Sequence, residues 1–185
     1  EIRANLNFEF FKIEDAINDF VLLYQNDLKG KKADYYLKTA AQMAFFNSNW
    51  EKAIQLNKEI IARFEKETGT EKQLVVKEAV WQLYVIEKSR NNVPRQIETL
   101  EAFILRYQND KSTSGKVFRA YGLIAEIYEG KGDKVSTTKM YRRIIEAFTK
   151  GGFERNGGPE ASAAAQSTFQ LLRPQFDDFM STKLV

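Results

Sequence analysis

The sequence predicts an all-α protein built from consecutive pairs of antiparallel helices, and three observations support this prediction. Apolar residues recur at the three- and four-residue spacing of amphipathic helices along most of the 185 residues. Only three prolines interrupt the chain, so long stretches are free of helix breakers. A short motif that ends helices also recurs at regular intervals, which is typical of helical solenoids.

The clearest repeat is an echo of eight residues. Residues 20–27 read FVLLYQND and residues 103–110, 83 positions later, read FILRYQND, with six of eight positions identical. Residues 60–64 read IIARF and residues 144–148 read IIEAF. An aliphatic stretch that ends in an aromatic residue therefore recurs every 40 to 43 residues, and four copies fit the chain.

Each copy ends one predicted helix, and a second periodic stretch lies between successive copies. The junctions carry turn and capping residues, namely NSN at 47–49, NNVP at 91–94 and GKGD at 130–133. Such short junctions imply antiparallel neighbours. In chain order, the predicted helices cover residues 9–27, 32–47, 50–66, 72–90, 94–108, 113–130, 134–149 and 159–182.

Apolar stripes justify the individual helices. The first helix contains FVLLY and the seventh contains IIEAF. In the second to sixth helices the stripes are Tyr36, Leu37, Ala40, Ala41, Ala44 and Phe45; Ala53, Ile54, Ile60, Ile61 and Phe64; Val75, Val76, Val80, Leu83 and Tyr84; Ile97, Leu100, Phe103, Ile104 and Tyr107; and Phe118, Tyr121, Ile124, Ala125 and Tyr128.

The last predicted helix follows the glycine-rich segment GGFERNGG and has Pro159 in its first turn. Its apolar face follows a 4-3-4-3 spacing and comprises Ala165, Phe169, Leu172, Phe176 and Phe179. Pro174 is expected to kink this helix. Because a solenoid needs a terminal element over its last exposed core, we expect this face to cap the stack; alternatively, it docks a partner.

Composition narrows the range of possible functions. Hydrophobic residues make up 43% and charged residues 29% of the chain, as in globular proteins. The 28 basic and 25 acidic residues are interleaved, and the net charge of +3 does not indicate nucleic-acid binding. No apolar run approaches the roughly 20 residues that cross a bilayer, so we expect no direct membrane insertion.

Candidate catalytic groups are scarce. The chain has no histidine and no cysteine, which removes the commonest general base, nucleophile and metal ligands. Neighbouring carboxylates such as Glu14 and Asp15, or Asp177 and Asp178, point about 100° apart on a helix and are expected on the surface. The glycine segments lack the Lys and Ser/Thr of a phosphate-binding loop. We therefore expect no enzyme activity, no cofactor and no metal.

The repeats resemble the tetratricopeptide family. Tyr121, Ile124, Ala125 and Tyr128 match its W-x2-L-G-x2-Y helix, and Gly132 with Asp133 form the turn before Tyr141. A second match runs from Leu37 through Ala40, Ala41 and the NSNW turn to Ala53. The resemblance implies an α-α superhelix of about eight helices with a C-terminal capping helix.

Three features depart from the family pattern. The period is 40 to 43 rather than 34 residues, the proline after the second helix is absent, and Gln96 and Thr137 stand where alanine is usual. Aromatic-ended helices with polar linkers also resemble the bacterial envelope-associated repeat proteins related to outer-membrane assembly lipoproteins.

The resemblance implies a concave groove lined by the first helix of each pair, with candidate partner-binding residues Tyr35, Lys38, Gln42, Phe46, Glu78, Trp81, Gln82, Val85, Lys88, Arg119, Glu126 and Glu129. Trp81 is the favoured anchor, with packing on a neighbouring helix as the alternative. Trp50 is expected to staple its turn. Lys38, Gln42, Gln82 and Arg119 only partly match a carboxylate clamp known in the family, because Leu123 replaces its last basic residue.

The expected function is a protein-binding adaptor or scaffold. The alternatives are a structural spacer within a longer solenoid or envelope complex, stacked on further repeats of the same chain, and a homo-oligomerisation module. We expect residues 1–185 to form one helical repeat domain from a longer protein, since the chain starts at Glu1. The lack of cysteine is compatible with a bacterial periplasm or envelope, which we favour, and with the cytoplasm.

Overall fold

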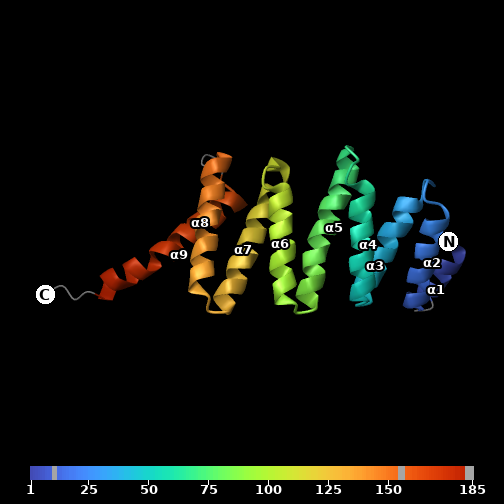
Figure 1. Cartoon of the computed structure of the whole chain (residues 1–185), viewed down its shortest axis with the longest axis horizontal. Helices are drawn as coiled ribbons and strands as arrows, with labels where there is room; N and C mark the ends of the chain where they lie inside the picture. The colour runs from blue at the N-terminus through green and yellow to red at the C-terminus, as the bar shows by residue number, and fades with distance from the viewer. Residues whose placement is uncertain (10–11, 154–156, 182–185) are drawn as a thin grey trace. The chain divides into compact units, whose positions relative to one another are not determined.

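The structure is a computed structural model that describes residues 1–9, 12–153 and 157–181. Within these ranges the chain forms nine α-helices and one short 3-10 helix, and it contains no strand (Figure 1). The all-α prediction is therefore confirmed. The elements are α1 (Ile2–Glu9), α2 (Ile13–Asn26), α3 (Ala33–Phe46), α4 (Trp50–Phe64), α5 (Thr70–Ser89), α6 (Val93–Tyr107), η1 (Lys111–Thr113), α7 (Ser114–Gly130), α8 (Lys134–Gly151) and α9 (Pro159–Ser181).

The helix predicted over residues 9–27 is found as α2, which begins at Ile13, and the preceding helix α1 was not predicted. The two helices pack together, and Ala4 and Ala16 are fully buried. Large apolar residues of α1, such as Ile2 and Leu6, are exposed, so the large apolar residues of α1 do not mark its buried face. The other seven helices are found within a few residues of the predicted bounds; residue 182, where the last was expected to end, lies outside the described ranges.

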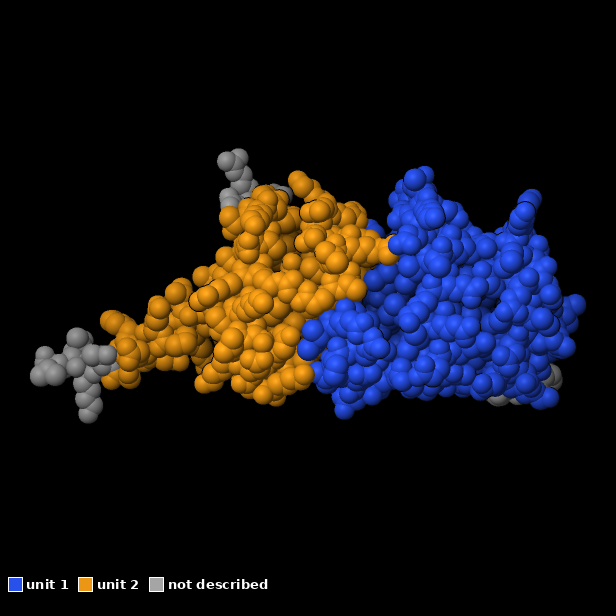
Figure 2. Space-filling model, in the orientation of Figure 1, with its two compact units in different colours: residues 1–99 blue, residues 100–185 orange. Residues whose placement is uncertain are grey.

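The chain divides into two compact units, Glu1–Thr99 and Leu100–Val185, with the boundary inside α6 (Figure 2). In unit 1, each helix from α1 to α4 packs against the next helix along the chain; in unit 2, α7, α8 and α9 pack against one another. The largest fully buried side chains of unit 1 are Ile17, Leu37, Leu56, Phe64, Val76 and Ile86. Those of unit 2 are Leu100, Phe103, Ile104, Ile124 and Ile144.

One three-residue turn occurs three times, after α3, α5 and α7. Its middle residue has a left-handed backbone, with φ of 57° at Ser48, 55° at Asn91 and 71° at Gly132. The third residue donates its backbone N–H to the carbonyl five positions earlier at 2.9–3.0 Å, which satisfies the end of the preceding helix. The turns lie 43 and 41 residues apart, so the sequence repeat corresponds to a repeated local structure.

The third turn residue also caps the following helix. The side-chain oxygen of Asn49 accepts from the N–H of Lys52 at 3.3 Å, and that of Asp133 accepts from the N–H of Ser136 at 3.0 Å. Four residues after each cap lies a buried position, which is occupied by Ala53, Gln96 and Thr137. The two polar residues are tolerated there because Gln96 donates to the Glu87 carbonyl at 3.4 Å and Thr137 to the Asp133 carbonyl at 2.8 Å.

The expectation that the apolar face of α9 caps the stack is wrong. Only Ala164 and Ser167 of α9 are buried, in the half of the helix that packs on α7 and α8. The predicted capping residues point elsewhere: Ala165, Phe169, Leu172, Phe176 and Phe179 are all exposed. The small residues of the opposite face form the contact because they permit close approach between helices, and α9 continues through Pro174.

No helix in the described ranges combines the length and apolarity needed to span a membrane.

Candidate functional site

The main candidate site is a hollow of about 420 Å³ in unit 1, between α3 and α5 with α4 behind it. We call it the α3/α5 groove. Its lining is apolar in the centre and carries charged and amide side chains. The lining residues are Lys38, Ala41, Gln42, Phe45 and Phe46 of α3, Asn57 of α4, and Leu74, Val75, Glu78, Ala79 and Gln82 of α5.

Local packing leaves an aromatic ring exposed at one edge of the groove. Phe45 packs edge-on against Trp50 with ring centroids 5.8 Å apart, which fixes the turn between α3 and α4 and confirms the expected stapling role of Trp50. The adjacent Phe46 is 82% exposed although it contacts Phe45. On the α5 side, Leu74 is 55% exposed. Two large apolar side chains therefore face solvent at the groove.

The floor of the groove is closed by small and internally satisfied residues. Ala41 and Ala79 are buried, and their short side chains leave the space that forms the hollow. The Asn57 amide is buried and donates to the Ala53 carbonyl at 2.8 Å. The floor is therefore preformed by α3, α4 and α5.

An ion-pair cluster ties together the three helices that form the groove. The Asp34 carboxylate of α3 accepts from Arg63 Nε of α4 at 2.9 Å and from Lys72 Nζ of α5. Lys72 Nζ also lies 4.5 Å from the ring centre of Phe64. Burial raises the pKa of Asp34, but the hydrogen bonds from Lys72 and Arg63 outweigh it and hold the pKa below its usual value.

A second hollow of about 370 Å³ adjoins the groove in unit 1. Gln42 and Phe46 line both hollows, so these two side chains form the wall between them. The remaining lining is largely apolar and comprises Phe8, Ile13, Thr39, Met43 and Asn47. The exposed Phe46 ring thus has an apolar hollow on each side.

The structure brings together five of the predicted partner-binding residues at the groove, namely Lys38, Gln42, Phe46, Glu78 and Gln82. Four others of unit 1 do not line it. Tyr35 packs against the rings of Phe20 and Tyr36 at 6.3 and 5.7 Å. Trp81 is half-buried with its ring edge-on to Tyr84 at 5.4 Å. Val85 is half-buried, and Lys88 is exposed in the last turn of α5.

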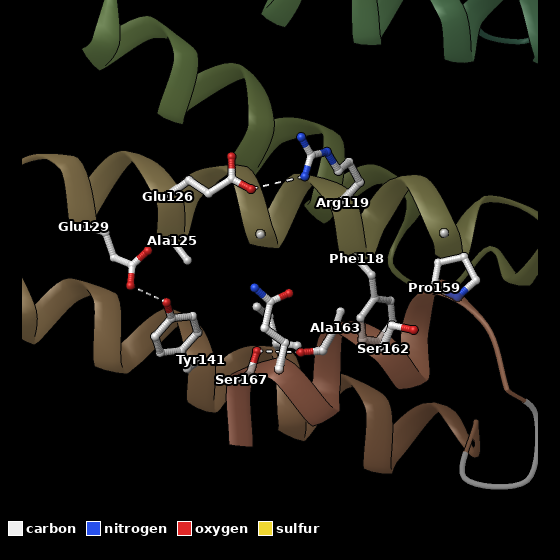
Figure 3. Close-up of a pocket in the computed structure, with 14 residues that line it drawn as sticks. Phe118, Arg119, Ala125, Glu126, Glu129, Tyr141, Pro159, Ser162, Ala163 and Ser167 are labelled. Atoms are coloured by element: carbon white, nitrogen blue, oxygen red, sulfur yellow. Dashed lines mark hydrogen bonds and ion pairs between the residues drawn. The ribbon is translucent and has the colours of Figure 1, made fainter. Parts of the chain in front are cut away.

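The three predicted residues of unit 2 line a separate hollow of about 230 Å³ between α7, α8 and α9. Figure 3 shows Arg119 paired with Glu126 at 3.1 Å, and Glu129 accepting from the Tyr141 hydroxyl at 2.6 Å. Burial and the Glu129 carboxylate together raise the pKa of Tyr141. This hollow is smaller than the α3/α5 groove, and we treat it as the weaker candidate.

The partial clamp is divided between the two units. Lys38, Gln42 and Gln82 share the α3/α5 groove, while Arg119 lies in unit 2 and pairs with Glu126. Leu123, which stands at the position of the family's last basic residue, is buried. What the structure brings together is one lysine and two amides.

Sequence reasoning missed several lining residues. Leu74 lies outside the apolar stripe predicted for its helix. Phe45 and Val75 were each assigned to the apolar stripe of their own helix rather than to a surface. Phe8 was missed because α1 was not predicted. In unit 2, Ser162 and Gln166 reach the hollow only because α9 folds back on α7, a long-range contact without a local signal.

Among the described residues, no group of three or more acidic side chains is arranged to hold a metal ion. No protein-family model matches the sequence, and no curated protein shows significant similarity to it.

Proposed function

We propose that the chain is a protein-binding module whose α3/α5 groove takes an apolar side chain from a segment of a partner protein. The observation that carries this proposal is the exposed Phe46 ring between two adjoining hollows. When a partner covers a large aromatic side chain that is exposed to water, the complex is stabilised by roughly 25 cal/mol per Å² of apolar surface buried. Exposed apolar side chains around a preformed hollow are typical of binding sites.

The groove also contains polar groups that suit a peptide. The amides of Gln42 and Gln82 each provide a donor and an acceptor, which matches the backbone of an extended or helical segment. Lys38 and Glu78 supply one charge of each sign. Aromatic anchors surrounded by polar groups are the pattern of protein interfaces, in which a few anchors dominate the binding energy.

The tetratricopeptide resemblance supports the same proposal. In that family the first helix of each pair lines the ligand groove, and α3 and α5 are the corresponding helices here. We propose a degenerate, long-period member of this architecture that serves as an adaptor.

Selection of peptides from a random display library on the purified chain tests the proposal. We expect selected peptides to share one or two large apolar residues and to bind with a Kd in the micromolar range. Truncation of a central aromatic anchor costs about 2 kcal/mol or more, so Phe46→Ser should weaken binding at least about 30-fold. Isothermal titration calorimetry on both proteins gives the two constants.

Leu105→Ser is the matched control, since Leu105 is 74% exposed and lies in unit 2, outside the groove. This variant should bind the selected peptides as tightly as the unchanged chain. A second groove variant, Gln82→Trp, should also weaken binding by filling the hollow. Equal affinity of all four proteins would refute the assignment of the site to the groove.

A further inference from the structure

The second half of α9 is a helix on which no other described segment packs. Every residue from Leu172 to Ser181 is exposed, whereas the first half of α9 packs on α7 and α8. Figure 1 shows this end of α9, in red, leading away from α8. An isolated helical stretch of about ten residues is marginal in water, and Pro174 lowers its stability further. The segment therefore needs a partner to remain helical.

A regular apolar seam begins at Phe169 and continues along the exposed half. Phe169, Leu172, Phe176 and Phe179 recur at 3-4-3 spacing, the a and d positions of a coiled coil, and are 52–74% exposed. Pro174 lies at the f position, directly opposite the seam, so it does not obstruct a second helix. Beside the seam, Arg173 is paired with Asp177 of the same helix, with 3.7 Å between Nε and Oδ2. The charge of Arg173 is therefore already compensated beside the apolar seam.

We propose that the α9 seam binds the α9 seam of a second copy of this chain, which makes the protein a two-fold dimer. The 3-4-3 spacing is symmetric about residue 174. When a second helix runs antiparallel, Phe169 therefore meets the partner's Phe179, and Leu172 meets the partner's Phe176. This self-complementarity is what a closed two-fold interface requires.

The available area suits a weak dimer. With Met180, which is 66% exposed beside the seam, five large side chains present roughly 600 Å² on one copy. Two copies can therefore bury at most about 1,200 Å², which reaches the lower limit of specific protein interfaces. We expect a dissociation constant in the micromolar range.

Antiparallel pairing is the arrangement that the fold favours. The rest of unit 2 packs on the first half of α9. Antiparallel α9 helices therefore place the two copies of unit 2 at opposite ends of the helix pair. A parallel pair would bring both copies of unit 2 side by side at one end.

Sedimentation equilibrium over about 1–200 µM tests the dimer. The mass should rise from the monomer value of 21.4 kDa to twice that value and no further. Phe176→Asp with Phe179→Asp should abolish dimerisation, and Leu172→Lys provides an independent disruption. Phe46→Asp, which changes an exposed ring in unit 1, should leave the dimer intact. A monomer at every concentration, a mass that grows beyond two copies, or a dimer that survives both α9 variants would overturn the proposal.

Disulfide trapping tests the orientation, because the chain has no cysteine of its own. In an antiparallel pair, the two copies of residue 169 lie about 15 Å apart along the axis, too far for a disulfide. Phe169→Cys alone should therefore not crosslink with itself, whereas mixing it with a size-tagged Phe179→Cys chain should give a crosslinked heterodimer. Self-crosslinking of Phe169→Cys without the mixed product would show the antiparallel arrangement to be wrong.

Discussion

Replacing Asp34 by asparagine removes the anion that joins α3, α4 and α5. The carboxylate accepts from both Arg63 and Lys72, and the side chains of all three residues are only 25–29% exposed. Opposite charges about 4 Å apart interact by about 4 kcal/mol near a protein surface. Partial exposure and the cost of ordering long side chains reduce this figure. We therefore expect Asp34→Asn to lower the free energy of unfolding of unit 1 by about 1–2 kcal/mol.

Tryptophan fluorescence measures this loss without interference from unit 2, because Trp50 and Trp81, the chain's two tryptophans, both lie in unit 1. A loss of this size in a unit of 99 residues lowers the melting temperature by about 5–10 °C. Glu98→Gln is the control, since it breaks the Arg95–Glu98 pair, whose side chains are 59% and 63% exposed. The control should cost no more than about 0.5 kcal/mol.

The stabilisation that Asp34 provides depends on pH, because the folded structure lowers the pKa of Asp34. The stabilisation is fully present above the pKa of the unfolded chain, about 3.9, and is lost as the pH falls below that value through the folded-state pKa. The difference in the free energy of unfolding between the unchanged chain and Asp34→Asn should therefore shrink as the pH falls from about 5 to about 2. A difference that stays constant over this range, or one no larger than that of Glu98→Gln, would refute the reasoning.

Three further predictions concern packing, turns and titration. Phe64→Ala should cost about 3–5 kcal/mol in urea unfolding followed by fluorescence, because Phe64 is 1% exposed, whereas Phe46→Ala should cost under about 0.5 kcal/mol; equal losses would contradict the burial pattern. Ser48→Gly should stabilise unit 1 and Gly132→Ser should destabilise unit 2, each by about 1 kcal/mol in chemical unfolding, since both positions have a left-handed backbone. A destabilising Ser48→Gly or a stabilising Gly132→Ser would contradict the repeated turn. In alkaline titration followed by tyrosine absorbance, several tyrosines should ionise later than free tyrosine, and the last of them should disappear in Tyr141→Phe, because burial and Glu129 raise the pKa of Tyr141; an unchanged titration would contradict this.

Local patterns predicted most of the helices, and the reason lies in the turns. Asn49, Asn92 and Asp133 are capping residues that act within their own helix, and the left-handed residue before each is a polar residue or a glycine. Such signals are contained in a few neighbouring residues. The first helix was missed because its contact with α2 rests on alanines, while Ile2 and Leu6 remain exposed.

Contacts between residues far apart in the sequence determine which face of a helix is buried, and local patterns do not predict these contacts. The apolar stripe of α9 was assigned to the core, but Ala164 and Ser167 on another face make the contact with the unit. The same limit applies to the groove. The tetratricopeptide resemblance predicted Lys38, Gln42, Phe46, Glu78 and Gln82. Leu74 is found at the groove only once α5 is packed beside α3 and α4.

Chemical-shift mapping by NMR shows residue by residue whether a partner segment binds in the α3/α5 groove. A selected peptide would be titrated into the isotopically labelled chain while the backbone amide signals are followed. The largest shifts are expected in residues 38–46 and 74–82, and Phe46→Ser should abolish them. Shifts concentrated in α7, α8 or α9, with residues 38–46 unaffected, would contradict binding in the groove.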